Sequence, residues 1–372
     1  MTGFDVIVLG AGIVGSACAM ECVRAGLRVA VVERDAALSG ATAAGMGHVV
    51  AMDGSPAQLA LTNYSRSLWR ELAPDLPANV EFEPRGTVWV AADDEEMREV
   101  HAKHATFAAA RIESEVLDSR ELAEAEPNLR PGLAGGLLVP DDCVLYPPAA
   151  AQFFLREAIR GGAILLCDQA AERIANGRVT LKDGSSYSAD KIVVATGVET
   201  HLLPWLPIQK RKGHLIITRP YPGFLHRQLV ELGYTRSAHS ITTDSVAFNI
   251  QPRPNGQIII GSSRQYLSQE EGVEPKVLER MLQRAQSYMP ALAEMPGIRS
   301  WAGFRAATPD NLPLIGATSD PGIFLAVGFE GLGITSAPAA ARLLVDALLG
   351  RVSEIDRTPF LPSRVAQAAA TS

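Results

Sequence analysis

Residues 5–33 read DVIVLGAGIVG, then SACAMECVR, AGL and RVAVVE. A short apolar run leads into a glycine-rich turn, a helix-like run over residues 16–24, and a second apolar run that ends at Glu33. The pattern predicts a strand, a tight turn, a helix and a second strand within about 30 residues, which is the context in which GxGxxG indicates dinucleotide binding. Such a unit opens a doubly wound parallel sheet and therefore predicts an α/β fold.

Each glycine of the turn has its own role in this prediction. Gly10 makes the tight turn, Gly12 lets the backbone approach a pyrophosphate, and Gly15 lets the helix lie close to the strand. The amino end of the helix supplies unpaired N–H groups and a partial positive charge to the phosphates. Glu33 can accept hydrogen bonds from ribose hydroxyls, and its charge disfavours the 2′-phosphate of NADP. NAD and FAD both stay open at this point.

Composition places the chain among globular proteins. Of its 372 residues, 47% are hydrophobic and 20% are charged, which allows an ample core and two domains or one large one. The 41 acidic and 34 basic residues give a formal charge of −7, which weakens any nucleic-acid-binding hypothesis. No apolar run approaches the roughly 18 residues of a spanning helix, and strand-like residues begin too early for a signal peptide. We therefore expect a cytoplasmic protein, either free or peripheral to the inner face of the membrane.

Cysteine and histidine spacing gives no metal signal. Cys18, Cys22, Cys143 and Cys167 show no CxxC spacing, so neither a disulfide framework nor a zinc or iron–sulfur site is expected. A histidine pair at 101 and 104 lacks a third ligand, so no metal is expected there either. The short basic run at 210–212 is interpreted as a solvated turn.

The rest of the chain alternates between two kinds of segment. The first kind resembles the opening unit in its apolar strands and helices. It comprises a helix at 147–160, a strand at 163–167, a hairpin at 178–187, the strand KIVVATG at 191–197, a strand at 322–328 and a helix at 335–349. The other kind holds alternating strands, such as 247–250 and 258–260, and charged helices at 94–110 and 274–288. We expect two interleaved domains: a nucleotide-binding domain of residues 1–80, 145–211 and 297–372, and a smaller mixed-sheet domain of residues 81–144 and 212–296.

Further motifs follow the first glycine turn and Glu33 in a recognisable order. They are ATG at 195–197, GFRAATPDNLPLIG at 303–316 and GFEGLG at 328–333. Together they resemble the FAD-dependent D-amino-acid oxidase superfamily, in the branch with glycine oxidase, sarcosine oxidase and D-amino-acid dehydrogenases. GSSRQ at 261–265 and GFEGLG look most similar to D-hydroxyproline dehydrogenase-like members. The resemblance covers nearly the whole chain and implies a doubly wound FAD domain and a smaller substrate domain whose mixed sheet roofs the flavin.

The residues themselves also favour FAD over NAD. Gly331-Leu332-Gly333 directly precedes the helix expected from Thr335, and a helix amino end there stabilises the negative charge that a reduced flavin gathers. The uncharged run 39–48 lets the backbone come into contact with a flat ring. The resemblance implies that the middle of this run, residues 43–46, contacts the flavin. Some relatives attach flavin covalently through a His or a Cys where this chain has Thr42 and Gly303, so non-covalent FAD is expected. The expected cofactor-binding residues are Gly10, Gly12, Ile13, Val14, Gly15, Glu33, Arg34, Ala41, Thr42, Ala43, Ala44, Gly45, Met46, Gly47, Ala171, Ala195, Thr196, Gly197, Gly303, Arg305, Gly328, Glu330, Gly331, Leu332, Gly333, Ile334 and Thr335.

In the reaction that the resemblance implies, a hydride moves from the α-carbon of an amino acid to flavin N5 and leaves an imine. Arg305 matches the family arginine that grips the substrate carboxylate with a bidentate fork, and Asn249 stands where relatives often have a Tyr as second carboxylate ligand. His48 accepts the amine proton, binds a substrate hydroxyl, or is a packed histidine. Glu330 pairs with a substrate ammonium or with Arg305, or faces solvent. His214 touches the substrate or only caps a turn.

The leading hypothesis is an FAD-dependent dehydrogenase or oxidase of a D-amino acid or a secondary imino acid, with cis-4-hydroxy-D-proline or D-proline as substrate. One alternative is an oxidase of the glycine or sarcosine type. A second is the flavin subunit of a heteromeric amino-acid dehydrogenase that needs iron–sulfur partner chains. A flavoprotein acting on modified nucleosides is disfavoured by the negative charge. Oxygen, a quinone or another carrier all stay open as electron acceptor, as do a homo-oligomer and heteromeric partners.

Overall fold

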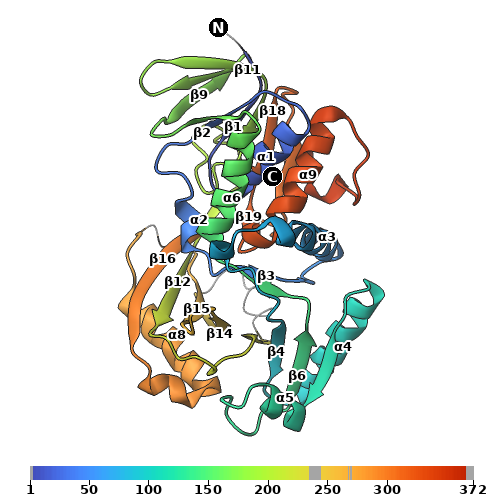
Figure 1. Cartoon of the computed structure of the whole chain (residues 1–372), viewed down its shortest axis with the longest axis vertical. Coiled ribbons are helices and arrows are strands. Elements are labelled where there is room, and N and C mark those ends of the chain that lie inside the picture. The colour runs from blue at the N-terminus through green and yellow to red at the C-terminus, as the bar shows by residue number, and fades with distance from the viewer. Residues whose placement is uncertain (1–2, 234–243, 267, 269, 366–372) are drawn as a thin grey trace.

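The computed structural model describes residues 3–233, 244–266, 268 and 270–365. Two sheets lie one above the other in Figure 1, and the helices α1, α6, α9 and α3 gather beside and below the upper one. The upper sheet has the strand order β17-β18-β11-β1-β2-β8, with β10 and β9 added beside β11. The lower sheet has the order β19-β16-β12-β15-β14-β13-β4-β6-β5. The predicted α/β architecture, with a doubly wound part interleaved with a mixed sheet, is confirmed.

The opening unit folds as predicted. It consists of β1 (Phe4–Leu9), α1 (Ile13–Arg24) and β2 (Val29–Val32). The first strand pairs in parallel with β2 on one side and with β11 on the other. The helix begins three residues before the expected Ser16, because Gly12 has the extended conformation of an N-cap. Val6 and Val8 pack toward α1 while Ile7 and Leu9 pack on the opposite face, and burial on both faces explains the unbroken apolar run.

The remaining strands of the upper sheet come from the middle and the end of the chain. They are β8 (Ile164–Leu166), β9 (Ala171–Ala175), β10 (Arg178–Leu181), β11 (Ser186–Val194), β17 (Leu314–Ala317) and β18 (Ile323–Val327). The sequence suggested a hairpin ending at 187 and a separate strand at 191–197, and this division is wrong. Both are β11, whose first residues pair antiparallel with β10 and whose later residues pair in parallel with β1. A strand that changes partner gives no break in an apolar and polar pattern.

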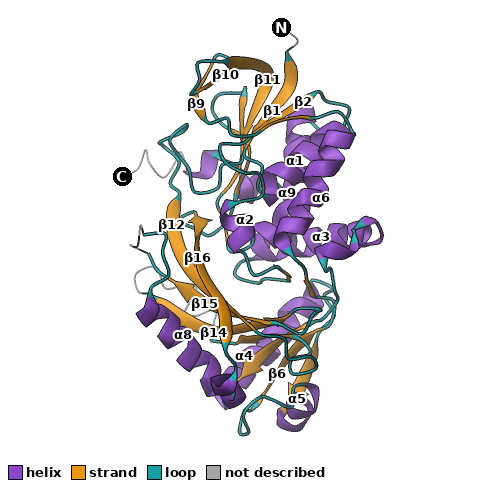
Figure 2. Cartoon of the chain, turned by 60° about the vertical axis from the view of Figure 1, so that its left-hand side comes forward, coloured by secondary structure: helices purple, strands orange, loops and turns teal. Residues whose placement is uncertain are grey.

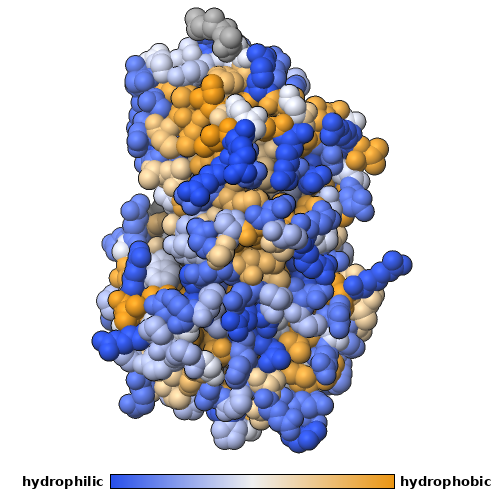
Figure 3. All heavy atoms as spheres, in the orientation of Figure 1, coloured by the Kyte–Doolittle hydropathy of each residue, from blue (hydrophilic) through white to orange (hydrophobic). Residues whose placement is uncertain are grey.

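Helices cover one face of the upper sheet. They are α3 (Pro56–Leu72), α6 (Pro147–Arg160) and α9 (Gly333–Leu349), which pack with α1 in a layer seen in Figure 2. The core between sheet and helices includes Cys18 and Cys22, which are fully buried free thiols. In the described part of the chain, no helix has both the length and the apolar character needed to cross a bilayer. Figure 3 shows hydrophilic and hydrophobic residues interspersed over one face of the molecule.

The lower sheet is mixed. Its strands are β4 (Thr87–Ala91), β5 (Glu115–Asp118), β6 (Gly135–Val139), β12 (Gln209–Thr218), β13 (Gln228–Glu231), β14 (Ser245–Pro252), β15 (Ile258–Arg264), β16 (Gly297–Ala307) and β19 (Phe329–Glu330). Only β13 and β4 pair in parallel among these described strands. The helices beside this sheet are α4 (Asp94–Ala109), α5 (Ser119–Ala125) and α8 (Pro275–Tyr288).

The remaining elements are short. They are α2 (Gly40–Ala44), the paired strands β3 (His48–Val49) and β7 (Cys143–Val144), and the 3-10 turns Ala73–Asp75, Ala78–Val80, Pro290–Glu294 and Thr358–Phe360. Sheet membership differs from the expected domain boundaries at three places. Residues 209–211, 297–307 and 329–330 lie in strands of the lower sheet, although the boundaries assign them to the nucleotide-binding domain. The division into domains itself stays a prediction.

Candidate functional site

The first glycine turn follows the carboxyl end of β1, between the neighbouring strands β11 and β2, which is where open α/β sheets bind ligands. Gly10 has φ +105°, and a Cβ added there would lie 2.6 Å from the carbonyl oxygen of Ala195. A Cβ added at Gly15 would lie 2.0 Å from the carbonyl oxygen of Gly10. Both positions therefore require glycine, the first for conformation and contact, the second so that α1 can pack on the turn.

The Glu33 carboxylate braces this turn. It accepts hydrogen bonds from the main-chain N–H groups of Ala11, at 2.7 Å, and of Asp35, at 3.0 Å. Its side chain also borders the cleft described next. Because an ionised carboxylate offers about four lone-pair sites, acceptor sites are left for the ribose hydroxyls that the sequence predicted.

A long cleft begins at the turn and extends to the lower sheet, with about 300 Å³ of space for water-sized groups. Most predicted cofactor residues border it: Gly10, Gly12, Ile13, Val14, Glu33, Arg34, Ala41, Thr42, Ala44, Gly45, Met46, Gly47, Ala195, Thr196, Gly197, Gly303, Arg305, Gly328, Glu330, Gly331, Gly333 and Ile334. Further lining residues that the sequence did not single out include Asp35, Ser39, Gly40, Val198, Glu199, Leu215, Ser262 and Phe304. None of these residue types marks a cofactor contact by itself, so no local pattern identified them.

Five predicted cofactor residues do not border this cleft. Gly15 packs against the carbonyl of Gly10 in the turn, and Ala43 is exposed on α2. Ala171 begins β9, beside His201. Leu332 borders an adjoining inner cavity instead, and the Thr335 hydroxyl donates to the carbonyl oxygen of His48. Thr335 and Gly15 therefore support segments that line the cleft without bordering it themselves.

The uncharged run 39–48 is held between the two layers. The Thr42 hydroxyl oxygen accepts a hydrogen bond from the N–H of Ile13 at 2.9 Å, so α2 is tied to the start of α1. From the lower sheet, Trp301 Nε1 donates to the carbonyl oxygen of Ala44 at 3.2 Å. A Cβ at Gly303 would lie 2.3 Å from the Cβ of Ala44, so the absence of a side chain there allows β16 to approach α2.

Two helix amino ends meet the cleft. α1 begins at Ile13, and α9 begins at Gly333, two residues before the expected Thr335. The N-cap residues Gly12 and Leu332 give no side-chain cap, and Thr42 occupies the N–H of Ile13. Other first-turn N–H groups and the positive dipole ends are therefore free to interact with a ligand in the cleft. A pyrophosphate suits the first end and an electron-rich ring edge suits the second.

Arg305 borders the cleft from β16. Its Nη1 donates a hydrogen bond of 2.9 Å to the carbonyl oxygen of Ser263. The guanidinium lies over Gly213 of the adjacent strand β12, where a Cβ would come within 2.5 Å of Nη1. A missing side chain on the neighbouring strand thus fixes the place of the arginine that the sequence predicted for carboxylate binding.

Glu330 is surrounded by guanidinium groups. Arg264 Nε donates to its Oε1 at 3.3 Å, Arg211 Nη1 lies 3.9 Å from the same oxygen, and the Gly331 N–H donates to Oε2 at 2.5 Å. Burial alone would raise the pKa of Glu330, but Arg264 and Arg305 outweigh it and lower the pKa to about 2. Glu330 is therefore an ionised, buried counter-ion of arginines, and the solvent-facing alternative is wrong. From the sequence, Arg264 was noted only within the motif at 261–265 and Arg211 only within a basic run interpreted as a solvated turn, and neither was assigned to the site.

His48 borders both the cleft and the inner cavity. Burial, followed by the positive charge of Arg305, lowers the pKa of His48 to about 4 against the opposing effect of Glu330. The imidazole is therefore neutral near pH 7. It can give or accept a hydrogen bond there, and it is a weak acceptor for an amine proton.

His214 belongs to a packed network rather than to the cleft. Its side chain is fully buried, its Nδ1 lies 2.9 Å from Ser263 Oγ, and its Nε2 accepts a hydrogen bond from the N–H of Glu274 at 3.0 Å. Glu274 is the N-cap residue of α8. The sequence left open whether His214 touches the substrate or only caps a turn. In the structure it accepts the N–H of Glu274 and contacts the hydroxyl of Ser263, the residue whose carbonyl binds Arg305.

The inner cavity is smaller, with about 60 Å³ of space for water-sized groups. It adjoins the cleft, since His48, Asn249, Glu330 and Gly331 border both. Its other walls come from the lower sheet and the segment after β3: Val50, Met52, Gly54, Gln58, Thr87, Trp89, Arg211, Gln228, Val230, Arg264, Asn311 and Leu332. Asn249, predicted as a substrate ligand, thus lies where the two spaces meet.

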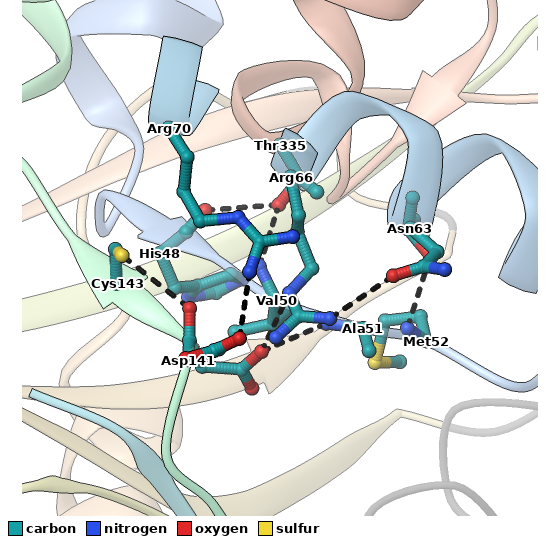
Figure 4. Close-up of polar contacts among 12 residues, drawn as sticks. His48, Val50, Ala51, Met52, Asn63, Arg66, Arg70, Asp141, Cys143 and Thr335 are labelled. Atoms are coloured by element: carbon teal, nitrogen blue, oxygen red, sulfur yellow. Dashed lines mark hydrogen bonds and ion pairs between the residues drawn. The ribbon is translucent and has the colours of Figure 1, made fainter. Parts of the chain in front are cut away.

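Polar contacts from α3 and α9 hold the segment that separates cleft and cavity (Figure 4). Thr335 Oγ1 donates to the carbonyl oxygen of His48 at 2.9 Å. The Ala51 N–H donates to Asp142 Oδ1 at 3.2 Å, and Arg66 Nε lies 3.0 Å from the same oxygen. Arg66 and Asp142 are almost fully buried, so this ion pair sits inside the protein rather than on its surface.

The lining fits FAD. Two glycine turns, two helix amino ends and a row of small residues give a narrow path along which backbone can approach a pyrophosphate and a flat ring. Gly12 faces this path, because a Cβ there would meet only Thr42 Oγ1, at 3.2 Å. Within the described ranges, no three or more His, Cys, Asp and Glu side chains are grouped to hold a metal ion.

Comparisons with known proteins give the family. The family described as DAO, FAD dependent oxidoreductase, matches residues 5–347. The chain is 28% identical to glycine oxidase from Pseudomonas aeruginosa over 96% of its own length and 98% of that protein. It is 25% identical to hydrogen cyanide synthase subunit HcnC from the same species, over 97% and 96% of the two chains. The crystal structure of L-proline dehydrogenase from P. horikoshii superposes with a TM-score of 0.88 at 22% identity and covers 98% of each chain.

The glycine turns, the cleft between the sheets and the family match across residues 5–347 all indicate an FAD-binding oxidoreductase. A solved member of this fold, an α-glycerophosphate oxidase from Mycoplasma pneumoniae, carries bound FAD. The chain belongs to the DAO family of FAD-dependent oxidoreductases, and FAD is its cofactor.

Proposed function

We propose that this enzyme oxidises a D-amino acid or a secondary imino acid at the bond between the α-carbon and nitrogen, with cis-4-hydroxy-D-proline and D-proline as the first candidates. One observation carries the proposal. Arg305 presents a guanidinium to the cleft beside the inner cavity, and Gly213 and the Ser263 carbonyl fix its position. A fixed guanidinium suits a carboxylate held at a set angle. Glycine oxidase from P. aeruginosa, an enzyme named for an amino-acid substrate, is a relative over nearly the full length.

The chain's own residues bind and orient in this proposal. Bound FAD supplies the acceptor for the hydride. Arg305 holds the carboxylate, and Asn249 at the junction of cleft and cavity adds a hydrogen bond. Neutral His48 can exchange a hydrogen bond with the substrate nitrogen, and the hydride leaves from the α-carbon once that nitrogen is neutral. Glu330 offsets the positive charge of the arginines around it.

Anaerobic mixing tests the proposal directly. The purified holoenzyme is mixed with cis-4-hydroxy-D-proline, D-proline, D-alanine, glycine or sarcosine, and the flavin absorbance near 450 nm is followed. Bleaching by a cyclic imino acid, followed by recovery of colour on admission of air or a quinone, supports the proposal and identifies the acceptor. An intact yellow enzyme that none of these compounds bleaches rejects it.

A heteromeric assembly is the second candidate. One of the relatives is named as a subunit, hydrogen cyanide synthase subunit HcnC. Cys18 and Cys22 lie one turn apart on α1, Cys143 lies in β7, and among the described residues no three or more possible ligands come together, so any iron–sulfur centre would come from a partner chain. Affinity purification from the native host, followed by iron analysis of the co-purified chains, distinguishes this candidate from an enzyme that works alone.

A further inference from the structure

The strands β12 and β15 lose one residue of register beside the arginine of the cleft. Ile216 pairs with Ile260 in the regular part of the two strands, and farther along Lys212 pairs with Gln265, just after β15. Three residues of β12 therefore stand opposite four residues of β15, which makes a β-bulge. Bulges redirect groups of the longer strand and are frequent next to active sites. Arg305 contacts β15 within this bulge.

Ser263 makes two different contacts in the bulge. Its hydroxyl oxygen accepts a hydrogen bond from the main-chain N–H of His214 at 2.9 Å, a bond that a carbonyl oxygen accepts in a regular ladder. Its carbonyl oxygen accepts a hydrogen bond from Arg305 Nη1, also at 2.9 Å. The side chain of Ser263 thus satisfies β12, while its carbonyl holds the guanidinium that lies over Gly213.

The His214 side chain contacts the same hydroxyl from the other face of the sheet. Side chains alternate along a strand, so Gly213 faces the guanidinium and His214 faces away from it. Nε2 of His214 accepts the N–H of Glu274 at 3.0 Å, so in the neutral ring the proton is on Nδ1, 2.9 Å from Ser263 Oγ. Burial, followed by the positive charge of Lys212, lowers the pKa of His214 and favours this neutral ring.

We propose that Ser263 and His214 are positioning residues, which fix the Arg305 guanidinium for the substrate carboxylate. The inference rests on the proposed function, in which Arg305 binds that carboxylate. The Ser263 hydroxyl receives one donor from the main chain and one from the side chain of His214, and these bonds orient the residue whose carbonyl Arg305 contacts. An arginine that is held before the ligand arrives loses less side-chain freedom on binding, so the affinity for a carboxylate is higher.

Two ligands that cannot be oxidised to an imine test the inference in the holoenzyme. Tetrahydrofuran-2-carboxylate and its neutral carboxamide are titrated, and the change in flavin absorbance gives the dissociation constants. Ser263→Ala should weaken binding of the carboxylate about three- to tenfold, because a loosened guanidinium must be ordered on binding. The carboxamide has no charge for Arg305 to hold, so its binding should change less than about twofold. Unchanged binding of the carboxylate, or equal weakening of both ligands, overturns the inference.

Variants of His214 separate positioning from packing. His214→Asn keeps a side-chain N–H for Ser263 but loses the acceptor for Glu274, whereas His214→Leu loses both. Only His214→Leu should weaken the carboxylate as Ser263→Ala does. Combining these two changes should add little further loss, because both act through one hydroxyl. Equal loss of carboxylate binding in the two His214 variants overturns the role of the histidine. This pair also decides the matter if Ser263→Ala does not fold.

Thr218→Val is the matched control. The Thr218 hydroxyl is also buried between β12 and β15 and accepts the main-chain N–H of Ile258 at 3.1 Å, but at the end of the two strands farther from Arg305. Its removal should leave both dissociation constants within about twofold of the native values.

Flavin bleaching separates this inference from the proposed function. Bleaching by an amino acid, together with carboxylate affinity that does not depend on Ser263, rejects the positioning role while the proposed function stands. Carboxylate affinity that depends on Ser263, in an enzyme that no amino acid bleaches, does the reverse.

Discussion

The guanidinium of Arg305 and the main-chain carbonyl of Ser263 are joined by a 2.9 Å hydrogen bond that crosses β12 between their two strands. The bond is possible because the residue between them on β12 is Gly213. Behind Ser263, its hydroxyl accepts a hydrogen bond from the N–H of His214. Arg305, which we propose binds the substrate carboxylate, is thus positioned by a main-chain carbonyl and by a missing side chain, with the negative charge of Glu330 nearby.

Gly213→Ala should disable substrate binding while the fold survives. The added Cβ would come within 2.5 Å of Arg305 Nη1, so the guanidinium must move from its place. We expect kcat/KM to fall about ten- to a hundred-fold with FAD still bound, because a displaced arginine loses a charge-assisted hydrogen bond. Gly272→Ala is the matched control, since a Cβ there meets nothing within 4 Å. Unchanged kinetics in Gly213→Ala would contradict the assignment of Arg305.

The pH profile of flavin reduction should not report His48. Its pKa of about 4 keeps the imidazole neutral from pH 6 to 9, so the rate should rise with pH only as the substrate amine loses its proton. His48→Asn should alter the size of the rate and leave the shape of the profile unchanged. Stopped-flow measurements at saturating and limiting substrate check this. An inflection between pH 6 and 7 that disappears in His48→Asn would show that the histidine titrates.

Glu330→Gln should lower stability and tighten binding of carboxylates. The change keeps the shape but removes the negative charge beside Arg264, Arg211 and Arg305, and breaking a buried ion pair costs about 3–5 kcal/mol. The uncompensated positive charge should make a simple carboxylate such as acetate or benzoate bind several-fold more tightly. Thermal unfolding and a flavin absorbance titration measure the two effects. Glu83→Gln, at a half-exposed pair with Arg85, is the control and should change neither by much.

Glu330 also gives a pH dependence with a fixed sign. Its folded pKa of about 2 lies below the ordinary glutamate value of 4.5, so the unfolded chain binds the proton first on acidification. The stabilisation by Glu330 is present above pH 4.5 and is lost as the pH falls toward 2. The stability difference between the native protein and Glu330→Gln should therefore shrink over that window, as urea unfolding at several pH values would reveal.

Asp142 should act with the opposite sign. Burial raises its pKa to about 6, although Arg66 and the Ala51 N–H act to lower it. The folded protein therefore takes up a proton at Asp142 before the unfolded chain does, and this gain is present below pH 3.8 and lost as the pH rises through about 6. Measured against Asp142→Asn, the native protein should become relatively more stable as the pH falls from 6 to 4. A difference that is constant with pH would mean that Asp142 keeps one charge state throughout.

FAD should be released by acid. The position of the family's covalent histidine holds Thr42, whose hydroxyl is engaged by the N–H of Ile13, and the position of its cysteine holds Gly303, packed against Ala44. Neither residue offers a nucleophile to the ring. Precipitation with trichloroacetic acid should leave all the flavin in the supernatant with the mass of intact FAD. Fluorescence that stays with the denatured protein on a gel would reject this prediction.

Sequence was most informative where a function depends on local spacing. Gly10, Gly12 and Gly15 stand at fixed distances along one turn, and their requirement follows from φ and from contacts within β1, α1 and the adjacent strand. The same holds for Arg305, which a short motif identified. Helix limits at 147–160 were also predictable, because Pro147 and Gly161 mark the ends.

Sequence failed where a residue's surroundings come from distant strands. The basic run 210–212 was interpreted as a solvated turn, yet it lies in β12, where Arg211 is 2% exposed and Lys212 fully buried. Arg211 is paired there with Asn311, a hundred residues away, and Lys212 with Glu274. Charged residues look solvent-exposed in a sequence because the partners that compensate their burial are far along the chain.

The amino-acid sequence by itself determined the cofactor turn and the α/β fold, because both depend on spacing within a few residues, and a motif shared with the family led us to predict Arg305 as the carboxylate ligand. Only the tertiary structure showed that His214 contacts the hydroxyl of Ser263, whose carbonyl holds Arg305, that Glu330 is a buried counter-ion of arginines, and that Trp89, Arg211 and Gln228 border one small cavity. Burial and pairing are properties of strands brought together across the sheet, and no local pattern in the chain encodes them.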